Sequence, residues 1–571
     1  MALVASCGTT TATSGGSSGS GATISTAVRQ ASVGASAADV LAANADTSEA
    51  VAAITDADGA GAYDASAATT ITASGGSVEV SGTSTGNVTT DSADGTTVTI
   101  TGSGTYVLTG TLDDGRVVVS AEDADVRLVL AGASITNADG PAIDVQDAGS
   151  AVMVLAEGTT NTLADGSSYA DTGEDAATAA LYSSDTLAIT GTGSLDVTGS
   201  YKDGISSKNG LVIAGGPTIT VNAADDGVRG KDYLLVSSGR LTVTAGGDGL
   251  KSSEDDDETK GFVALGAATV TVASGDDGIS ATTDVTVDGT TLSITAGGGQ
   301  ASATVSGQEP GQGGPERGAP DQDQSADSTE ADSTPSPKGI NAGVAYAQDS
   351  GSVTIDAADE GLQGAFVNVN GGSLDIASGD DGVNASNGDS TIEGYENADS
   401  ESDDGSAITI SGGQVQIDYA SSDGIDSNGS AHVTGGEVVV GGAAGTMDGS
   451  VDANGETTLV GVSASLAVAE GDTITVTSAD GTSWTLTSRV SADAVTVLGL
   501  SEGAEYTVST TSGGSTTAAA SALSAGMDGG PGGPGGLGRR PRHARPHRGP
   551  LGPPLRGHRG RRTARRPAER G

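Results

Sequence analysis

The side chains with the clearest chemical potential in this 571-residue sequence are acids that recur in one short phrase. Each phrase is an acidic residue followed by glycine and an aliphatic residue, and its acids are Asp203, Asp226, Asp248, Asp277, Glu360, Asp381 and Asp423. If the repeats stack, these acids form a column of carboxylates about 5 Å apart, where each pair repels by roughly 1 kcal/mol even in water. A cation between two carboxylates removes that cost, and oxygen atoms are the ligands that Ca²⁺ takes. The phrase therefore predicts a column of acids that binds calcium.

Several phrases carry a second acid, which extends the set of candidate ligands. The predicted metal ligands are Asp225, Asp226, Asp248, Asp276, Asp277, Asp359, Glu360, Asp380, Asp381 and Asp423. Lys338 takes the place of the acid in one repeat, so the pattern does not extend calcium to that repeat. An alternative interpretation is that Asp-Gly is simply a turn dipeptide. Both interpretations can hold, because the glycine can turn the chain while some carboxylates bind a cation.

The spacing of the phrases indicates a repeat protein made of strands. The intervals between the acids are 23, 22, 29, 83, 21 and 42 residues, and most are near 22 or twice 22. Between the phrases lie runs such as Leu241-Thr242-Val243, whose alternation of apolar and polar residues is typical of strands. Glycine pairs such as Gly215-Gly216 permit the positive φ of a tight corner. The sequence predicts an all-β protein, a right-handed parallel β-helix with coils of about 22 residues and a small antiparallel β unit at its C-terminal end.

Changes in composition divide the chain into five expected segments. These are a truncated lipoprotein signal at residues 1–7, a flexible linker at 8–68, the β-helix at 69–452, the small β unit at 453–522 and a Gly/Pro/Arg tail at 523–571. The signal segment rests on Val4-Ala5-Ser6-Cys7, which resembles a bacterial lipobox with Cys7 as the lipidated residue. The basic tail is read either as a binding arm or as an out-of-frame extension, and we favour the second interpretation.

The charge of the chain limits the classes of partner that it can bind. Its formal net charge is −49, and such a surface repels nucleic acid and anionic lipid but attracts cations. We expect a monomer on the outside of the cell, attached to the membrane only through a lipid on Cys7. A solvated acidic surface without further function is the alternative, but it does not explain acids fixed at one place in each repeat.

The repeated phrase, together with the runs of type Gly-Gly-x-Leu-x-Ile, resembles the carbohydrate-binding β-helix family of bacterial exported proteins. The stretch Gly503-Ala504-Glu505-Tyr506-Thr507-Val508 extends this resemblance, which covers about residues 77 to 520. The resemblance implies a fold similar to that of pectate lyases, bound calcium, and binding of an acidic plant polysaccharide (polygalacturonate) or of cellulose.

Catalysis is not expected from the residues present. Three of the four histidines lie in the tail and His432 is expected on the surface. Calcium-assisted β-elimination of a uronate would need a basic arginine, for which Arg229 is the best candidate, and a surface arginine paired with acids is the alternative reading. The predicted function is therefore non-catalytic binding of an acidic, polygalacturonate-like polysaccharide with calcium. A calcium-dependent pectate lyase and a structural or adhesive stalk are the two alternatives.

Overall fold

The protein is described from a computed structural model, which describes residues 23–44, 62–303, 336–442 and 449–525 apart from 94, 174–175, 389 and 399–401. These residues belong to one compact unit, Met1–Met527. Strands dominate it, and the described helices are short, so the prediction of an all-β protein is confirmed. None of the described helices is long and apolar enough to cross a membrane.

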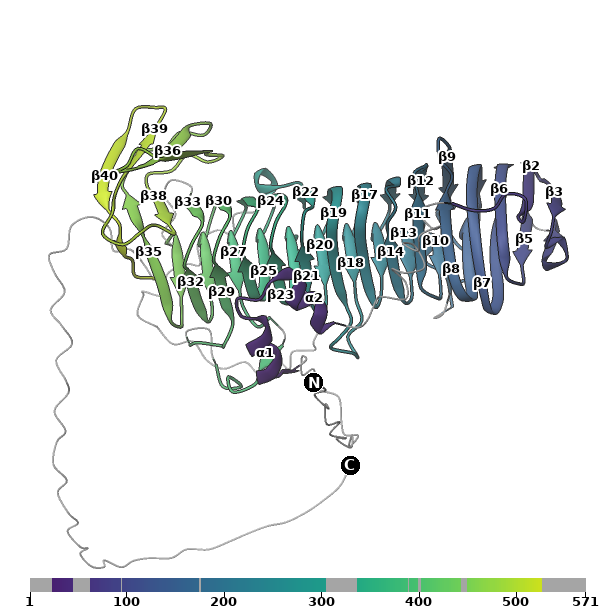
Figure 1. Cartoon of the computed structure of the whole chain (residues 1–571), viewed down its shortest axis with the longest axis horizontal. Helices are drawn as coiled ribbons and strands as arrows, with labels where there is room; N and C mark the ends of the chain where they lie inside the picture. Colours follow the sequence, from purple (N-terminus) through teal and green to yellow (C-terminus); the bar gives the residue numbers. More distant parts are fainter. Residues whose placement is uncertain are drawn as a thin grey trace, which may run out of the picture. The chain divides into compact units, whose positions relative to one another are not determined.

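Most strands belong to three ladders in which each strand pairs in parallel with its equivalent in the next repeat (Figure 1). We call one repeat of three strand segments a rung. The strands of the first ladder are β10 (Ala179–Ser183), β13 (Asp203–Ser207), β16 (Val228–Gly230), β18 (Leu250–Ser252), β20 (Ile279–Ala281), β27 (Val383–Ala385), β31 (Ile425–Ser427) and β34 (Val451–Ala453). Those of the second ladder are β11 (Leu187–Gly191), β14 (Gly210–Ile213), β21 (Val285–Val287), β29 (Ala407–Ile410), β32 (Ser430–Val433) and β35 (Thr457–Ala464).

The third ladder completes each rung, and several long strands pass from one ladder into the next. Its strands are β9 (Thr160–Ala164), β12 (Ser194–Gly199), β15 (Thr218–Ala223), β22 (Thr291–Ala296), β24 (Ser352–Ala357), β26 (Ser373–Ser378), β30 (Gln414–Tyr419) and β33 (Glu437–Gly442). The long strands are β7 (Gly115–Thr136), β8 (Ile143–Leu155), β17 (Tyr233–Ala245), β19 (Phe262–Ser274), β23 (Ile340–Gln348) and β25 (Leu362–Val369).

The pairing register keeps equivalent residues of successive repeats beside one another. Ile205 pairs with Val228, Val228 with Leu250, and Leu250 with Ile279. These aliphatic members of the phrases are fully buried in the main core. They therefore point inward, and each rung adds small apolar side chains to one continuous core.

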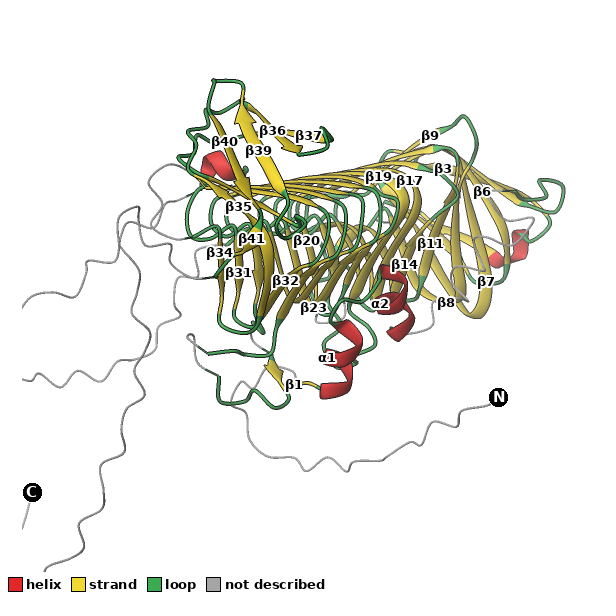
Figure 2. Ribbon diagram, turned by 60° about the vertical axis from the view of Figure 1, so that its left-hand side comes forward, coloured by secondary structure: helices red, strands yellow, loops and turns green. Residues whose placement is uncertain are grey.

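Antiparallel pairs occur at both ends of the ladders (Figure 2). At the N-terminal end these involve β2 (Thr69–Gly75), β3 (Ser77–Gly82), β4 (Val88–Asp91) and β5 (Thr96–Ile100), beside β6 (Gly104–Leu112). At the C-terminal end β38 (Val495–Leu498) and β41 (Ser521–Ala522) pair with the last rungs. A separate antiparallel sheet contains β36 (Thr473–Ser478), β37 (Ser483–Thr487), β39 (Glu505–Thr510) and β40 (Ser515–Ala519), as the sequence predicts for this part of the chain.

Residues 23–44 correct the prediction of a flexible linker over 8–68. They form helices α1 (Thr26–Ser32) and α2 (Ala37–Ala43), which begin at the N-caps Ser25 and Ser36. The chain before them adds β1 (Thr23–Ile24), which pairs with β28 (Thr391–Ile392). The helices pack on the outside of the ladders through a small apolar cluster that includes Val40 and Phe366 (Figure 1). The helical segment is thus an ordered part of the unit.

Candidate functional site

The acids of the phrases lie in register along the start of the first ladder, and we call them the acid column. Most of these acids are tied to the next rung by a hydrogen bond from a backbone N–H to the carboxylate. The N–H of Asp248 donates to Oδ1 of Asp226 (3.1 Å), and the N–H of Asp277 donates to Oδ1 of Asp248 (3.0 Å). The same bond joins the N–H of Asp423 to Oδ1 of Asp381 (2.8 Å). Backbone amides therefore stabilise the carboxylate charges, for which the sequence analysis expected only cations as partners.

Lysines supply cations to two parts of the acid column. The Nζ atom of Lys251 lies 3.0 Å from Asp226 and 2.8 Å from Asp248, between two successive acids. Lys338, which replaces the acid of its own rung, places its Nζ 2.6 Å from Glu360. The residue that breaks the sequence pattern is therefore the counter-ion of the neighbouring rung.

The glycine of the phrase is required by close packing rather than by a turn. A Cβ atom on Gly249 would lie 2.2 Å from Cγ1 of Val272 and 2.6 Å from the carbonyl oxygen of Gly278. Gly278 itself would clash in the same way, at 2.3 Å from Cγ2 of Ile294. Neither glycine has a positive φ, whereas Gly215 and Gly216, at a corner, have φ of 79° and 91°. The corner role thus belongs to the glycine pairs, and the Asp-Gly glycines let the acid column approach the core.

Burial makes the charged form of several acids costly. It raises the pKa of Asp277 to about 6, although the N–H of Lys338 and the amide of Asn341 donate to its carboxylate. It raises the pKa of Asp381 to about 8. A cation or a proton at these positions would lower the free energy of the folded state.

The structure brings only some of the predicted ligands into groups that could hold a metal ion. Asp248, Asp276 and Asp277 form one such group, with carboxylate oxygens within 4.8 Å of one another. A second group contains the predicted Asp423 together with Asp426 and Asp452. The last two were missed because each follows the aliphatic residue instead of preceding it, in Ile425-Asp426-Ser427 and Val451-Asp452-Ala453. A third group, Glu254, Asp255 and Asp256, lies in an insertion outside the phrases.

The other predicted ligands have different surroundings. Asp225 is exposed beside Asp226. Asp359 accepts a hydrogen bond from Ser336, and Asp380 accepts hydrogen bonds from Ser421 and Ser422. Cys7, the predicted lipidation site, lies outside the described residues.

Directly after the aliphatic residue of each rung, and three residues after the position of the acid, side chains that point outward form a second polar column. We call it the outer column, and register pairs join its members Arg229, Lys251, Ser280, Asn341, Gln363, Asn384, Asp426 and Asp452. All of them are half-buried. The column changes from basic through amide and hydroxyl groups to acidic along the ladder. Arg229, the candidate base, donates to the hydroxyl of Ser253 through Nε (3.2 Å) and Nη2 (2.8 Å).

A polar pocket of 460 Å³ lies at the middle of the outer column. Ser280, Asn341 and Gln363 line it from three successive rungs, and Ser386 and Asn387 line it from the chain after β27. The amide of Gln363 donates to the hydroxyl of Ser386 (3.1 Å). Amides and hydroxyls both donate and accept hydrogen bonds, as the hydroxyl groups of a sugar require.

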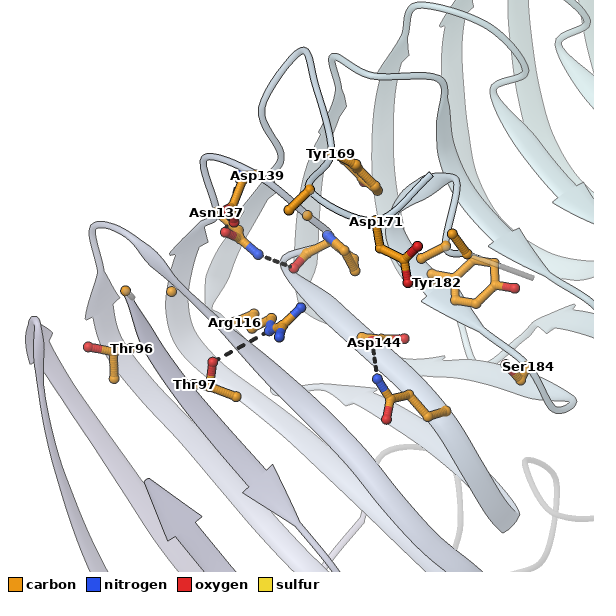
Figure 3. A pocket seen from close by; sticks show the side chains of 18 residues that line it. Thr96, Thr97, Arg116, Asn137, Asp139, Asp144, Tyr169, Asp171, Tyr182 and Ser184 are labelled. Carbon is orange, nitrogen blue, oxygen red and sulfur yellow. Dashed lines mark hydrogen bonds between the residues drawn. The ribbon is translucent and has the colours of Figure 1, made fainter. Parts of the chain in front are cut away.

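A larger pocket, of 650 Å³, lies beside the N-terminal continuation of the same column (Figure 3). Asp144 of β8 and Tyr182 of β10 are register neighbours there, and Arg116 of β7 points into the space between the strands and the connecting loops. Sequence analysis missed this pocket because its rungs lack the acidic phrase. The Asp139-Gly140 dipeptide, which lines the pocket, was the available signal.

Comparisons with known proteins point to carbohydrate binding. Residues 94–382 match the family described as carbohydrate-binding domain-containing protein. A protein of that description from Acetivibrio thermocellus is 36% identical over 121 residues, which are 21% of this chain and 42% of the relative, so the match spans less than half of the relative. A solved structure of the polysaccharide lyase-like protein from C. thermocellum, a gadolinium derivative, is 29% identical, with a TM-score of 0.38 over 40% of this chain and 92% of that chain.

Proposed function

Because this chain belongs to the carbohydrate-binding domain-containing protein family, we propose that it binds an acidic, polygalacturonate-like polysaccharide along the outer column without cleaving it. The observation that carries the proposal is the register of the outer column, which repeats outward-facing hydrogen-bonding groups once per rung from Arg229 to Asp452. Strands of neighbouring rungs lie about 4.8 Å apart. A linear polymer presents its own groups at regular intervals, so it can meet one rung after another.

The proposal includes a right-handed parallel β-helix as the scaffold. It is supported by three parallel ladders whose pairings connect residues one repeat apart. Such a scaffold keeps the outer column straight and rigid, so binding would order few protein groups and lose little conformational entropy.

Calcium is part of the proposal at two places. Asp248, Asp276 and Asp277 would hold one ion, and Asp423, Asp426 and Asp452 a second. Their convergent oxygens suit the flexible coordination of Ca²⁺. An ion there supplies positive charge through which an anionic polymer can approach a protein of net charge −49. Arg229 and Lys251, at the basic end of the outer column, add cationic partners for carboxylates.

We propose that the polysaccharide is not cleaved because the guanidinium of Arg229 donates hydrogen bonds to the hydroxyl of Ser253. A catalytic base would instead have to accept a proton from the substrate. Incubation with polygalacturonate and calcium should release no unsaturated uronides. Their release by the native protein, and its loss in Arg229→Ala, would replace this proposal by the lyase alternative.

The binding proposal is tested by titrating polygalacturonate into the protein with calcium and with EDTA. The double variant Asn341→Ala/Gln363→Ala should lower the affinity roughly tenfold, because two hydrogen-bonding groups are lost. His432→Ala is the matched control, since His432 is an outward residue of the second ladder. Equal affinity for the double variant and the control would contradict the outer column as the binding surface.

Calcium is tested in the same titration and by thermal melting. Calcium should raise the melting temperature, because a ligand bound only by the folded state stabilises it. Asp276→Asn combined with Asp452→Asn should reduce this shift, whereas Asp225→Asn should not, since Asp225 lies outside both groups. An equal shift in all three proteins would contradict the two sites.

A cell-surface location through a lipid on Cys7 completes the proposal. The sequence Val4-Ala5-Ser6-Cys7 supports it. Labelling with a fatty-acid analogue in a bacterial host should mark the native chain and not Cys7→Ala, and labelling of neither would contradict the anchor.

A further inference from the structure

We propose that the 650 Å³ pocket around Arg116 is a second saccharide site, which takes a neutral sugar unit and does not need calcium. We call it the N-terminal pocket. It is lined by Arg116, Asp139, Asp144, Tyr169, Asp171 and Tyr182 among others. Its volume is in the range of small-molecule sites, and it differs from the outer column in being walled by loops.

Polar groups enter the N-terminal pocket from three parts of the chain. Arg116 comes from β7, Asp144 from β8, and Asp171 from the connection before β10, and their side chains converge in Figure 3. The Nε atom of Arg116 donates to the hydroxyl of Thr97 (3.4 Å), and the Arg116 side chain lines the pocket. The amide of Gln146 donates to Asp144 (2.7 Å). A sugar hydroxyl that donates to a carboxylate and accepts from the guanidinium would use both kinds of group.

Bonds within the structure fix the walls of the N-terminal pocket. The ring of Tyr169 stacks on Tyr201 with centroids 4.2 Å apart, and its hydroxyl donates to Asp165 (2.7 Å). The N–H of Ala170 donates to the carbonyl of Asp139 (2.8 Å). The buried amide of Asn137 donates to the carbonyl of Pro141 (2.9 Å). The pocket is therefore formed before any ligand enters, which lowers the entropy cost of binding.

The charges lining the N-terminal pocket select against an anionic sugar. Arg116 contributes one positive charge, and Asp139, Asp144 and Asp171 contribute three negative charges, a balance of −2. Burial raises the pKa of Asp144, but its protonation would still leave a balance of −1. A uronate carboxylate would meet this negative field, whereas a neutral pyranose would not.

Calorimetric titration in EDTA tests the inference apart from the calcium-dependent polymer site. The probes are neutral tetrasaccharides of glucose, mannose, xylose and galactose, with tetragalacturonate for comparison. At least one neutral probe should bind, and tetragalacturonate should bind more weakly than that probe. Binding of none of the neutral probes, or a preference for tetragalacturonate, would overturn the inference even if polygalacturonate bound the outer column in calcium.

Variants locate the binding on the N-terminal pocket. Arg116→Ala and Asp171→Asn should each weaken the neutral probe roughly tenfold or more, because a charged hydrogen-bond partner is lost. Arg127→Ala is the matched control, since Arg127 lies on the same strand and contacts the carbonyl of Ala62 instead. Arg116→Ala and Asp171→Asn are both made because either one alone could misfold. A melting temperature equal to that of the native protein would show that a variant is folded. Unchanged affinity in both, or an equal loss in the control, would overturn the assignment.

Discussion

The carboxylate of Asp226 accepts a hydrogen bond from the backbone N–H of Asp248, its counterpart one rung later, at 3.1 Å. The negative charge of Asp226, which would repel the carboxylate of Asp248 at this spacing, is thus stabilised by the backbone N–H of Asp248. Repetition of the bond at Asp248 and Asp381 makes it a feature of the fold rather than of one rung. The acid column therefore has a structural role whether or not calcium binds to part of it.

We predict that Asp277→Ala destabilises the protein even in EDTA. Asp277 accepts from the N–H of Lys338 (2.9 Å) and from the amide of Asn341 (3.0 Å). Removal of the carboxylate leaves these donors without that acceptor at a buried site, which costs roughly 1–3 kcal/mol per group. Thermal melting in EDTA should show a lower melting temperature than that of the native protein.

Asp277→Asn separates this hydrogen-bonding role from the charge. Its carbonyl oxygen can still accept from the N–H of Lys338, so in EDTA the variant should be more stable than Asp277→Ala. It also loses a buried charge whose cost is shown by the raised pKa of Asp277, about 6. Equal melting temperatures for the two variants would show that the hydrogen bonds of Asp277 contribute little.

We predict that Gly278→Ala is strongly destabilising. The added methyl group would lie 2.3 Å from Cγ2 of Ile294 and 2.5 Å from the carbonyl oxygen of Gly339, so both the core and the next rung would have to shift. Overpacking of this kind costs about 1–3 kcal/mol. Urea unfolding should occur at a lower concentration.

Gly86→Ala is the control for this prediction, because a methyl group there would meet no atom within 4 Å and its φ is not positive. A decrease in stability as large as that of Gly278→Ala would mean that the clash is not the cause.

The fold class could be predicted because one residue pattern recurs, with few changes, along the ladders from Asp203 to Asp423. The burial of Ile205, Val228 and Leu250 follows from alternation along a strand, and the parallel register follows from the near-constant period. The reason for the Asp-Gly pair could not be read from the sequence. A glycine needed for positive φ and a glycine needed for close packing look the same until the neighbouring side chain, here Val272 beside Gly249, is placed.

The candidate site was predicted in part, for a physical reason. Sequence spacing aligned the acids but did not show which groups donate hydrogen bonds to them. Lys338 was therefore interpreted as an interruption of the pattern, although its ammonium group forms an ion pair with Glu360. Arg116 was missed because its pocket is built from three segments that share no motif. Helix α2 was missed because residues 8–68 contain few large apolar residues. The available signal was Ser36 followed by Asp39, where the serine side chain accepts from the N–H of Asp39.

Asp284, at the start of β21, joins helix α2 to the ladders. Its Oδ2 accepts from the amide of Asn44 (2.9 Å), and its Oδ1 accepts from the N–H of Ala345 (2.9 Å). The residue is buried, with 8% of its surface exposed. Burial raises its pKa from 3.8 to about 6, against the effect of these two hydrogen bonds. The folded protein therefore binds a proton at Asp284 more tightly than the unfolded chain does.

We predict that this contribution to stability falls as the pH rises. Because the pKa of Asp284 is higher in the folded state, the contribution is fully present below pH 3.8 and is lost as the pH rises through about 6. A shift of this size corresponds to about 3 kcal/mol at most. Asp284→Asn removes the titration, so the difference in melting temperature between the native protein and the variant should move in favour of the variant from pH 4 to pH 7. Melting curves of both proteins in EDTA across this range provide the measurement. A difference that stays constant with pH, or moves in favour of the native protein, would contradict a raised pKa at Asp284.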